Sequence, residues 1–210
     1  MKHNRLVFVT QNPHKLEEVQ HIFKKNTLSN ISLEGLQKLG FIGDIPENEK
    51  TLKGNAWAKA AFIHNRYGCN CFADDTGLEV DALDGRPGVY SSRYAGIEGD
   101  AGKNVEKLLG ELQGINSRTA RFRTFICLIL NDTIRYFEGR VEGKILEAPE
   151  GTMGFGYDPV FLPDGYDQSF AVMEPELKNR ISHRYDAINK LIRFLSGPEG
   201  KSLLKQHGDH

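Results

Sequence analysis

The stretch Ala120–Val141, ARFRTFICLILNDTIRYFEGRV, decides the fold class of this chain. Asn131-Asp132 fits a tight hairpin turn, and Ile134–Val141 reads as the returning strand. The first half alternates as a strand does when its two faces meet different surroundings, with one face made of Phe122, Thr124, Ile126, Leu128 and Leu130. We therefore expect a long antiparallel hairpin.

Helical and strand-like segments surround this hairpin. Asn12 followed by Pro13 suits a helix start, because Asn can cap the helix and Pro needs no hydrogen-bond partner at the first helical position. The remaining expected elements are strands at Leu6–Val9 and Cys71–Ala73, a helix over 51–67 that ends at Gly68, a helix capped by Asp100, and a last helix from Ser182. The sequence therefore predicts a mixed α/β protein that is not regularly doubly wound.

Length and charge exclude several classes of function. The chain has 210 residues, which suits one domain, here expected over residues 1–196 with a polar, frayed tail at 197–210. Its 27 basic and 28 acidic residues give a formal net charge of −1. This balance argues against a dedicated nucleic-acid surface and against a polybasic membrane patch.

Cysteine content and the N-terminus favour a cytoplasmic protein. Three cysteines give no even-numbered disulfide framework, and Cys69-x-Cys71 lacks zinc-site spacing, so we expect buried thiols in a reducing compartment. The apolar run Leu6–Val9 is too short for a signal sequence, and no stretch approaches a membrane span.

The first polar cluster is Thr10–Lys15, between a strand and a helix. Backbone N–H groups and the positive end of the helix dipole would converge there, which suits a phosphate, and Lys15 would add a charge. The segment is not a Walker loop, because its glycines and the Gly-Lys-Ser/Thr ending are missing. A capped surface helix with a solvated lysine is the alternative.

The second cluster is Asp74-Asp75, which follows an apolar strand. Two adjacent carboxylates repel each other, and a divalent cation would neutralise them. Mg²⁺ prefers one or two carboxylates together with water and substrate phosphates, and a carboxylate could also take a proton from the attacking water. An ordinary Asp-rich turn is the alternative.

The third cluster is the glycine-rich segment Gly151–Pro159. Its glycines would let a flat ligand approach and stack on Phe155, and Asp158 could accept hydrogen bonds from a ring N–H or a ribose hydroxyl. The alternative is a hairpin loop with Phe155 in the core.

The fourth cluster joins Lys178 to Ser182-His183-Arg184. Ser182 is a natural helix cap, but cations at a helix N-terminus oppose the dipole. His183 and Arg184 therefore indicate a partner rich in acceptors, such as a purine 6-keto oxygen.

Four blocks of this sequence, in this order, resemble the Ham1 or inosine triphosphate pyrophosphatase family: Ala73–Leu78, Gly88–Tyr94, Gly154–Pro159 and Ile181–Arg184. Each block is suggestive by itself, and the four in order are specific. The resemblance extends from about Leu6 to Leu195. It implies an enzyme that hydrolyses ITP, dITP and XTP to the nucleoside monophosphate and pyrophosphate, with Mg²⁺ as cofactor.

The resemblance also implies a role for individual residues. Asp75 matches the general base and a metal ligand, with Asp74 and Glu47 as further metal-site carboxylates. Thr10, Asn12, Lys15 and Lys59 match contacts to the phosphates, and Thr76 matches a further substrate contact. The positions that match base recognition are Phe155, Gly156, Tyr157, Asp158, Lys178, His183 and Arg184.

The implied fold is an elongated, two-lobed structure with a central mixed sheet, flanking helices, an active-site cleft between the lobes and a homodimeric assembly. Two other functions stay open at this point. A nucleotide sensor without turnover would not need Asp74-Asp75 and both lysines, and a pyrophosphatase for modified pyrimidines does not match the blocks around Phe155 and His183. A dehydrogenase is excluded, because no Gly-x-Gly-x-x-Gly follows the first strand.

Overall fold

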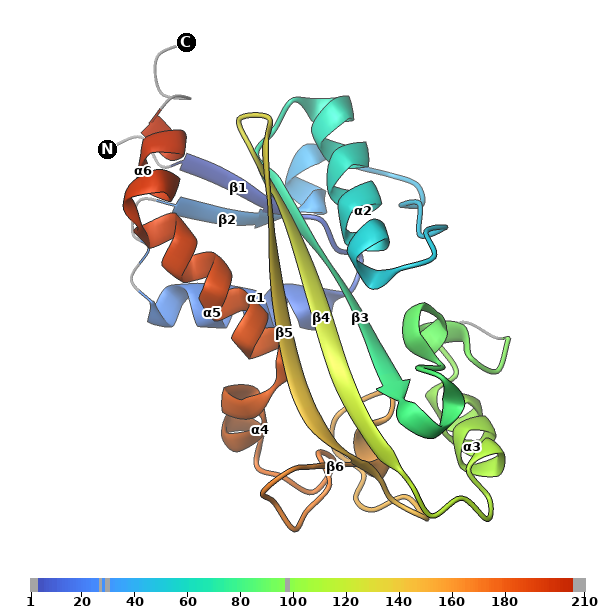
Figure 1. Ribbon diagram of the computed structural model, residues 1–210. Helices are drawn as coiled ribbons and strands as arrows, with labels where there is room; N and C mark the ends of the chain where they lie inside the picture. Colours follow the sequence, from blue (N-terminus) through green and yellow to red (C-terminus); the bar gives the residue numbers. More distant parts are fainter. Residues whose placement is uncertain (1–3, 27, 29–30, 97–98, 206–210) are drawn as a thin grey trace. The chain divides into compact units, whose positions relative to one another are not determined.

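The computed structural model describes residues 4–26, 28, 31–96 and 99–205 (Figure 1). The strands are β1 (Asn4–Phe8), β2 (Ile31–Gly35), β3 (Cys71–Val80), β4 (Thr119–Leu130), β5 (Thr133–Ile145) and β6 (Phe161–Pro163). The α-helices are α1 (Pro13–Lys25), α2 (Leu52–Tyr67), α3 (Ala101–Glu111), α4 (Pro175–Ile181), α5 (His183–Ser196) and α6 (Pro198–Lys205). Short 3-10 helices are η1 (Leu36–Leu39), η2 (Asp81–Leu83), η3 (Gly88–Arg93) and η4 (Asp158–Val160).

The strands form one mixed sheet in the order β2-β1-β3-β4-β5-β6. β1 is parallel to both β2 and β3, whereas β5 and β6 are antiparallel. β4 and β5 are joined by Asn131 and Asp132, whose φ angles of 47° and 62° are the left-handed values of a tight hairpin turn. The mixed α/β class and the hairpin are confirmed.

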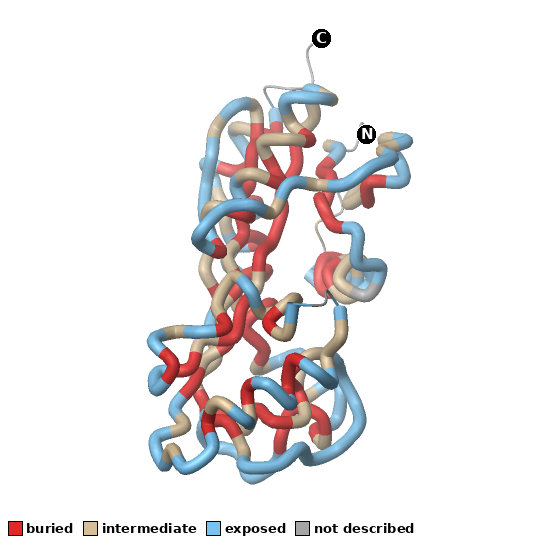
Figure 2. Tube along the Cα trace, turned by 90° about the vertical axis from the view of Figure 1, so that its right-hand side faces the viewer, coloured by how far each residue is buried: buried red, intermediate tan, exposed pale blue. Residues whose placement is uncertain are grey.

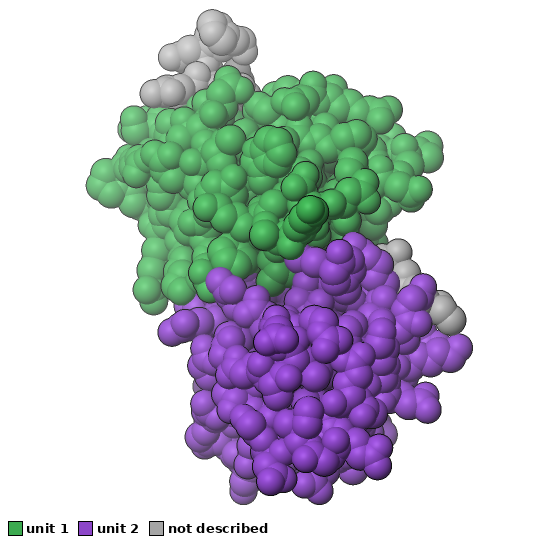
Figure 3. All heavy atoms as spheres, turned by 45° about the vertical axis from the view of Figure 1, so that its right-hand side comes forward, with its two compact units in different colours: residues 1–75, 125–138, 187–210 green, residues 76–124, 139–186 purple. Residues whose placement is uncertain are grey.

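The chain divides into two compact units, coloured separately in Figure 3. Unit 1 contains residues 1–75, 125–138 and 187–210, and unit 2 contains residues 76–124 and 139–186. The strands β3, β4 and β5 each contribute residues to both units. Each unit has a hydrophobic core of its own, which Figure 2 shows as buried segments enclosed by exposed loops.

In unit 1, strand alternation assigns each helix to a face of the sheet. Val7, Val9, Cys71 and Ala73 pack in one core cluster with Ala56, Ala60 and Ile63 of α2. The intervening residues point to the opposite face, where Phe8 stacks on Phe72 at 4.7 Å and Phe23 of α1 lies 6.2 Å from Phe72 between ring centroids. The two sides of β3 in unit 1 therefore meet α2 and α1.

In unit 2, the core gathers around the amphipathic helix α3. Asp100 caps this helix as expected, its side chain accepting a hydrogen bond from the Lys103 N–H. The apolar face of α3 packs with strand residues and with the segments on both sides of β6, in a cluster that includes Leu78, Val105, Leu108, Leu112, Phe122, Tyr157, Phe161 and Phe170.

The expected end of β3 at Ala73 is wrong, because the strand continues to Val80. Leu78 and Val80 are buried, and Glu79 between them pairs with Arg123 at 3.0 Å. This alternation is that of a strand with one apolar face. Asp74 and Asp75 therefore lie within a strand, where successive side chains leave on opposite faces, and the Asp-rich turn is excluded.

Four of the strands and α-helices were not expected from the sequence: β2, β6, α4 and α6. The frayed tail is wrong for residues 198–205, which form α6; Leu204 is buried, and the Asn131 side-chain amide donates to the Leu203 carbonyl. The rest of that tail, residues 206–210, lies outside the described residues. None of the helices in the described part of the chain has the length and apolar character that a membrane span requires.

Candidate active site

In unit 1, the start of α1 carries a lysine against a buried carboxylate. The Asn12 side chain accepts a hydrogen bond from the Lys15 N–H at 3.3 Å and so caps the helix. Thr10 also accepts a hydrogen bond, from the Asn12 N–H at 3.1 Å. Lys15 Nζ lies 3.0 Å from Asp74 Oδ1 and 2.9 Å from Oδ2. The alternative of a solvated Lys15 is thus excluded, because the lysine is ion-paired.

The face of α2 that meets β3 supplies two donors to Asp75. Lys59 Nζ lies 2.9 Å from Asp75 Oδ1, and Asn55 Nδ2 donates to Oδ2 at 3.1 Å. The same Lys59 ammonium lies 2.9 Å from Glu47 Oε1. Because neighbouring residues of a strand leave on opposite faces, Asp75 meets α2 and Asp74 meets α1.

Burial and charge act against each other in this cluster. Burial raises the pKa of Asp75, and Lys59 opposes that rise only in part. Burial works to lower the pKa of Lys59, but Asp75, Asp74 and Glu47 outweigh it and raise the pKa. Asp75 is therefore a carboxylate of raised basicity held beside a protonated lysine.

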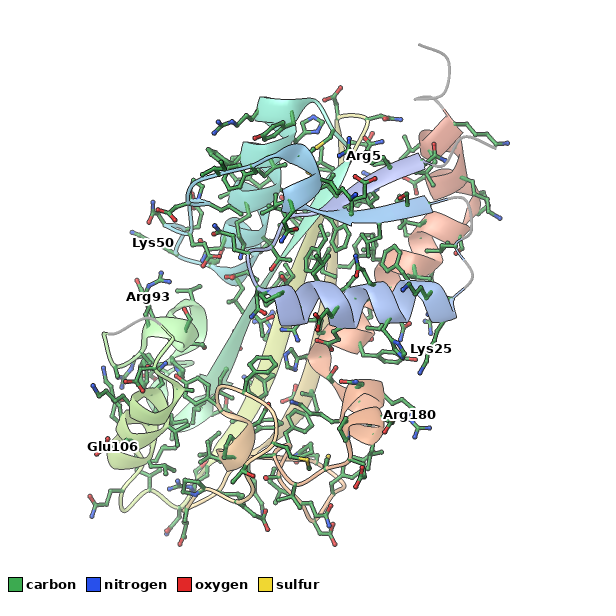
Figure 4. The ribbon with its side chains drawn as sticks, turned by 180° about the vertical axis from the view of Figure 1, so that it is seen from behind. Arg5, Lys25, Lys50, Arg93, Glu106 and Arg180 are labelled. Carbon is green, nitrogen blue, oxygen red and sulfur yellow. The ribbon has the colours of Figure 1, made fainter. Side chains whose placement is uncertain are left out.

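Most other charged side chains of this protein lie in solvent. Lys25, Lys50, Glu106 and Arg180 are exposed and lie at the periphery of the view in Figure 4. Asp74, Asp75 and Lys59, in contrast, are at most 8 % exposed. Charged groups are rarely buried unless they are paired, so these positions are adapted to hold charge away from water.

The cluster fits a hard divalent cation bound together with a polyphosphate. Glu47 and Asp75 converge on one cationic point, the Lys59 ammonium. Within the described residues, no group of three or more His, Cys, Asp or Glu side chains is arranged to hold a metal ion. Mg²⁺ commonly takes one or two carboxylates and completes its shell with water and phosphate oxygens. Asp75 and Glu47 are such a pair.

In unit 2, the glycine-rich loop folds over a second buried aspartate. Asp158 Oδ2 accepts a hydrogen bond from the Phe155 N–H at 2.7 Å and from Lys178 Nζ at 2.6 Å. Gly154 has a φ of 81°, and a Cβ there would collide with Asp158 and press on Lys178. The glycine therefore allows the loop to close on this ion pair.

The Phe155 ring lies at the surface beside two cations. Phe155 is 56 % exposed, so the alternative of a core side chain is excluded. Lys178 Nζ lies 5.2 Å from the ring centroid, and the Arg184 guanidinium carbon lies 5.9 Å from it. Tyr157 differs: it is buried, and its hydroxyl donates to the Ser91 carbonyl at 3.0 Å.

The start of α5 presents His183 and Arg184 in fixed orientations. Ser182 caps the helix by accepting a hydrogen bond from the Tyr185 N–H at 3.1 Å, as expected. The His183 ring stacks on Phe122, with 4.8 Å between centroids and an interplanar angle of 17°. Arg184 is buried. Packing on Phe122 thus orients the His183 ring, and the buried Arg184 lies beside Phe155.

The model of the Ham1 family matches residues 6–194 of the chain. This chain belongs to the Ham1 family. Among its relatives, the dITP/XTP pyrophosphatase of Porphyromonas gingivalis is 51 % identical over 192 residues, which cover 91 % of this chain and 97 % of the relative. The dITP/XTP pyrophosphatase of Bacillus subtilis is 41 % identical, with 90 % and 96 % covered.

Solved structures of Ham1 proteins have the same fold. The Staphylococcus aureus Ham1 protein aligns with a TM-score of 0.84 at 35 % identity, covering 92 % of this chain and 99 % of that one. A Ham1 protein from Coxiella burnetii aligns with a TM-score of 0.86 at 34 % identity, covering 92 % and 98 %. These likenesses confirm the family that the four sequence blocks indicated.

Most of the residues singled out from the sequence of this Ham1 protein fall into two groups. The group in unit 1 comprises Thr10, Asn12, Lys15, Glu47, Lys59, Asp74 and Asp75; the group in unit 2 comprises Phe155, Gly156, Tyr157, Asp158, Lys178, His183 and Arg184. Thr76 belongs to unit 2, and its hydroxyl lies 2.7 Å from that of Thr124. The roles of these residues stay predictions.

Sequence reasoning missed two supporting residues. Asn55 had a detectable signal, because it stands four positions before Lys59 and so shares its helix face. Phe122, which holds the His183 ring, had none: its alternation within the strand predicts burial but not the partner.

Proposed function

We propose that this Ham1 protein hydrolyses deaminated purine nucleoside triphosphates, namely dITP, XTP and ITP, to the monophosphate and pyrophosphate. The observation that carries the proposal is the buried Asp75 carboxylate, held between Lys59 and Asn55 next to a second lysine–carboxylate pair. Membership of the Ham1 family and the dITP/XTP pyrophosphatases at 41–51 % identity support it.

The triphosphate binds at the unit 1 cluster. The N-terminus of α1 directs backbone N–H groups and the positive dipole end toward an anion, and Thr10 and Asn12 flank it. Lys15 and Lys59 supply positive charge to the phosphates and to the pyrophosphate that leaves. Both lysines are already held against carboxylates, so little ordering is needed when substrate arrives.

Asp75 and Glu47, with Asp74 nearby, would hold Mg²⁺. When bound, this ion offsets the phosphate charge and makes a water molecule more acidic. Asp75 then accepts a proton from the attacking water. The water oxygen forms a bond to the α-phosphorus, and the bond from that phosphorus to the α–β bridging oxygen breaks, so that pyrophosphate leaves. Burial raises the pKa of Asp75, which makes its carboxylate a stronger base than an exposed aspartate.

The base binds at the unit 2 cluster, where the ring stacks on Phe155. Hypoxanthine and xanthine present a 6-keto acceptor and an N1–H donor, whereas adenine presents a 6-amino donor. Lys178, His183 and Arg184 can donate to the keto oxygen. Both donors to Asp158 reach Oδ2, and Oδ1, which receives none from the described residues, can accept the N1–H. ATP would leave these groups unpaired, a mismatch that can cost several orders of magnitude in kcat/KM.

We further propose that the enzyme acts as a homodimer on the cytoplasmic nucleotide pool. The family resemblance supports the dimer, and free thiols at Cys69, Cys71 and Cys127 fit a reducing compartment. Sedimentation velocity tests the assembly: a species of two chains is expected, and a single-chain species at micromolar concentration would contradict it.

The experiment that tests this function measures pyrophosphate released from dITP, ITP, XTP, GTP, ATP and dTTP, with Mg²⁺ and with excess chelator. Fast, Mg²⁺-dependent release from dITP, ITP and XTP with little from ATP is expected. Binding of ITP without release of pyrophosphate would indicate a nucleotide sensor that has no turnover. Strong turnover of dTTP would show that the proposed base site is wrong.

A further inference from the structure

Asn55 is a buried polar side chain on α2, only 1 % exposed. Its Nδ2 donates to Asp75 Oδ2 at 3.1 Å, and its Oδ1 accepts the Glu49 N–H at 2.9 Å. The partners fix how the amide is turned, because the reversed amide would set its oxygen against a carboxylate and its NH₂ group against an N–H. A single side chain is thus bonded on both sides in a unique orientation.

The segment that carries Glu47 is tied to α2 at several points. Glu47 pairs with Lys59, and two residues later the Glu49 N–H is bonded to Asn55. Gly54 lies directly beneath this segment, since a Cβ there would approach Glu49 Cβ to 2.9 Å. The close approach places Glu49 within reach of the Asn55 amide.

Asn55 and Lys59 act on the same carboxylate from one helix face. They are four residues apart, so their side chains are neighbours on α2. Lys59 donates to Asp75 Oδ1 and Asn55 donates to Oδ2, which leaves the carboxylate plane little freedom to rotate. Lys59 is charged and must also serve the phosphates, whereas the neutral Asn55 can keep its contact throughout a turnover.

We propose that Asn55 is a positioning residue that orients the Asp75 carboxylate and aligns it with the Glu47 segment. This role rests on the proposed function, in which Asp75 accepts a proton from water. A misplacement of about 1 Å at such a group can cost about a hundredfold in rate. In this proposal Asn55 acts on the reaction through its hydrogen bond to Asp75.

Two substitutions separate this role from a purely structural one. Asn55→Ala removes both hydrogen bonds, whereas Asn55→Asp keeps an acceptor for the Glu49 N–H and sets an oxygen where the donor to Asp75 was. Both variants are expected to lower kcat for dITP by about 10- to 100-fold, with KM changed by no more than about threefold. If Asn55 only held the Glu49 segment, Asn55→Asp would keep wild-type kcat, and the proposal would fall.

Asn70 provides the matched control. It is also a buried Asn of unit 1, and its Oδ1 accepts the Asn131 N–H at 2.8 Å. Asn70→Asp keeps that acceptor, just as Asn55→Asp keeps its own, and is expected to leave kcat within about twofold. An equal fall in kcat for both Asp variants would mark a general response to buried charge and overturn the proposal.

A readout without turnover completes the test. In ¹⁵N–¹H NMR spectra of the full chain, the Asn55 side-chain amide protons are expected to exchange slowly and to shift in Asp75→Asn. Signals that do not respond to Asp75→Asn would overturn the positioning role. If the wild-type chain hydrolyses none of the triphosphates but the Asn55 signals respond, the proposed function fails and the coupling of Asn55 to Asp75 stands.

Discussion

The two units of this Ham1 protein contain versions of one arrangement, a buried aspartate that accepts from one lysine and one neutral N–H. In unit 1, Asp75 is bonded to Lys59 and to the Asn55 amide. In unit 2, Asp158 is bonded to Lys178 and to the Phe155 backbone. The donors of Asp75 occupy both of its oxygens, whereas those of Asp158 share Oδ2.

The surroundings of the two aspartates separate their chemistry. Asp75 lies in a strand next to Asp74, and Glu47 shares its lysine, so charge dominates there. Asp158 begins a 3-10 helix behind a glycine loop, and its lysine lies over the Phe155 and Phe170 rings. The same pairing therefore suits phosphate and metal in unit 1 and a flat base in unit 2.

The largest effect on turnover is expected from a substitution of Asp75, the proposed proton acceptor. Asp75→Asn removes the proton acceptor while keeping the shape of the side chain, and kcat for every triphosphate should fall by about 10²–10⁴-fold. Circular dichroism should show an intact fold. In the matched variant Asp158→Asn, kcat should fall more for dITP than for dATP. An equal fall for both substrates in Asp158→Asn, or a near-normal kcat in Asp75→Asn, would contradict the separate roles of the two aspartates.

Arg184→Ala tests the donors to the base. Removal of the guanidinium beside Phe155 takes away a hydrogen bond to the 6-keto oxygen that ATP cannot form. The kcat/KM for ITP should fall by about 10- to 100-fold and that for ATP by much less. Equal losses on the two substrates in steady-state assays would rule out discrimination by this arginine.

Gly154→Ala tests the loop that closes on Asp158. Its added Cβ would meet Asp158 and Lys178 at a positive φ, so kcat/KM for dITP should fall by about tenfold or more. Gly165→Ala is the control, because Gly165 lies outside both groups and has a positive φ of 82°, but its Cβ would meet nothing within 4 Å. Similar losses of kcat/KM in both variants would show that backbone strain alone causes the effect.

The smallest effect is expected at a unit 1 contact outside both clusters. Burial works to lower the pKa of His64, but its hydrogen bonds to the Cys69 carbonyl and to Asp132 outweigh burial and raise the pKa. The protonated form is therefore favoured by folding. The stabilisation is complete below the unfolded pKa of about 6.5 and is lost as pH rises through the raised folded value.

Asp132→Asn should accordingly lower Tm at about pH 5.5–6 and hardly at all at about pH 8. The effect at the lower pH should be small, because the Asp132 carboxylate is 93 % exposed. Thermal melts across this range measure the difference, and His64→Gln should remove its pH dependence. Since His64 belongs to neither cluster, kcat for dITP should stay unchanged in both variants. A Tm difference that grows with pH would have the wrong sign.

Local rules predicted the parts of this fold that depend on neighbours in sequence. Asn12, Asp100 and Ser182 were identified as helix caps and Gly68 as a helix end, because a cap needs only the next three residues or a left-handed φ. The β4–β5 hairpin was recognised from its alternation and turn. β2, β6, α4 and α6 were missed, because each has eight residues or fewer and is too short to show a clear periodicity.

The candidate site was predictable in its members but not in its pairings. Asp74 and Asp75 were expected to act together at a strand end, yet a period of two residues sends them to different helices. That Lys59 bridges Glu47 and Asp75 depends on how the segment before α2 folds back over Gly54. No spacing in the sequence encodes that return.

The central claim is that one aspartate–lysine pair serves the phosphates and the other reads the base. Its most direct test is the ratio of kcat/KM for dITP to that for dATP in Lys59→Met and Lys178→Met, two substitutions that replace the ammonium by an apolar side chain of similar length. Lys59→Met should lower kcat/KM for dITP and for dATP by the same factor, which leaves their ratio unchanged. Lys178→Met should lower the ratio by about tenfold or more. An unchanged ratio in Lys178→Met, or a ratio that falls in Lys59→Met, would contradict the account.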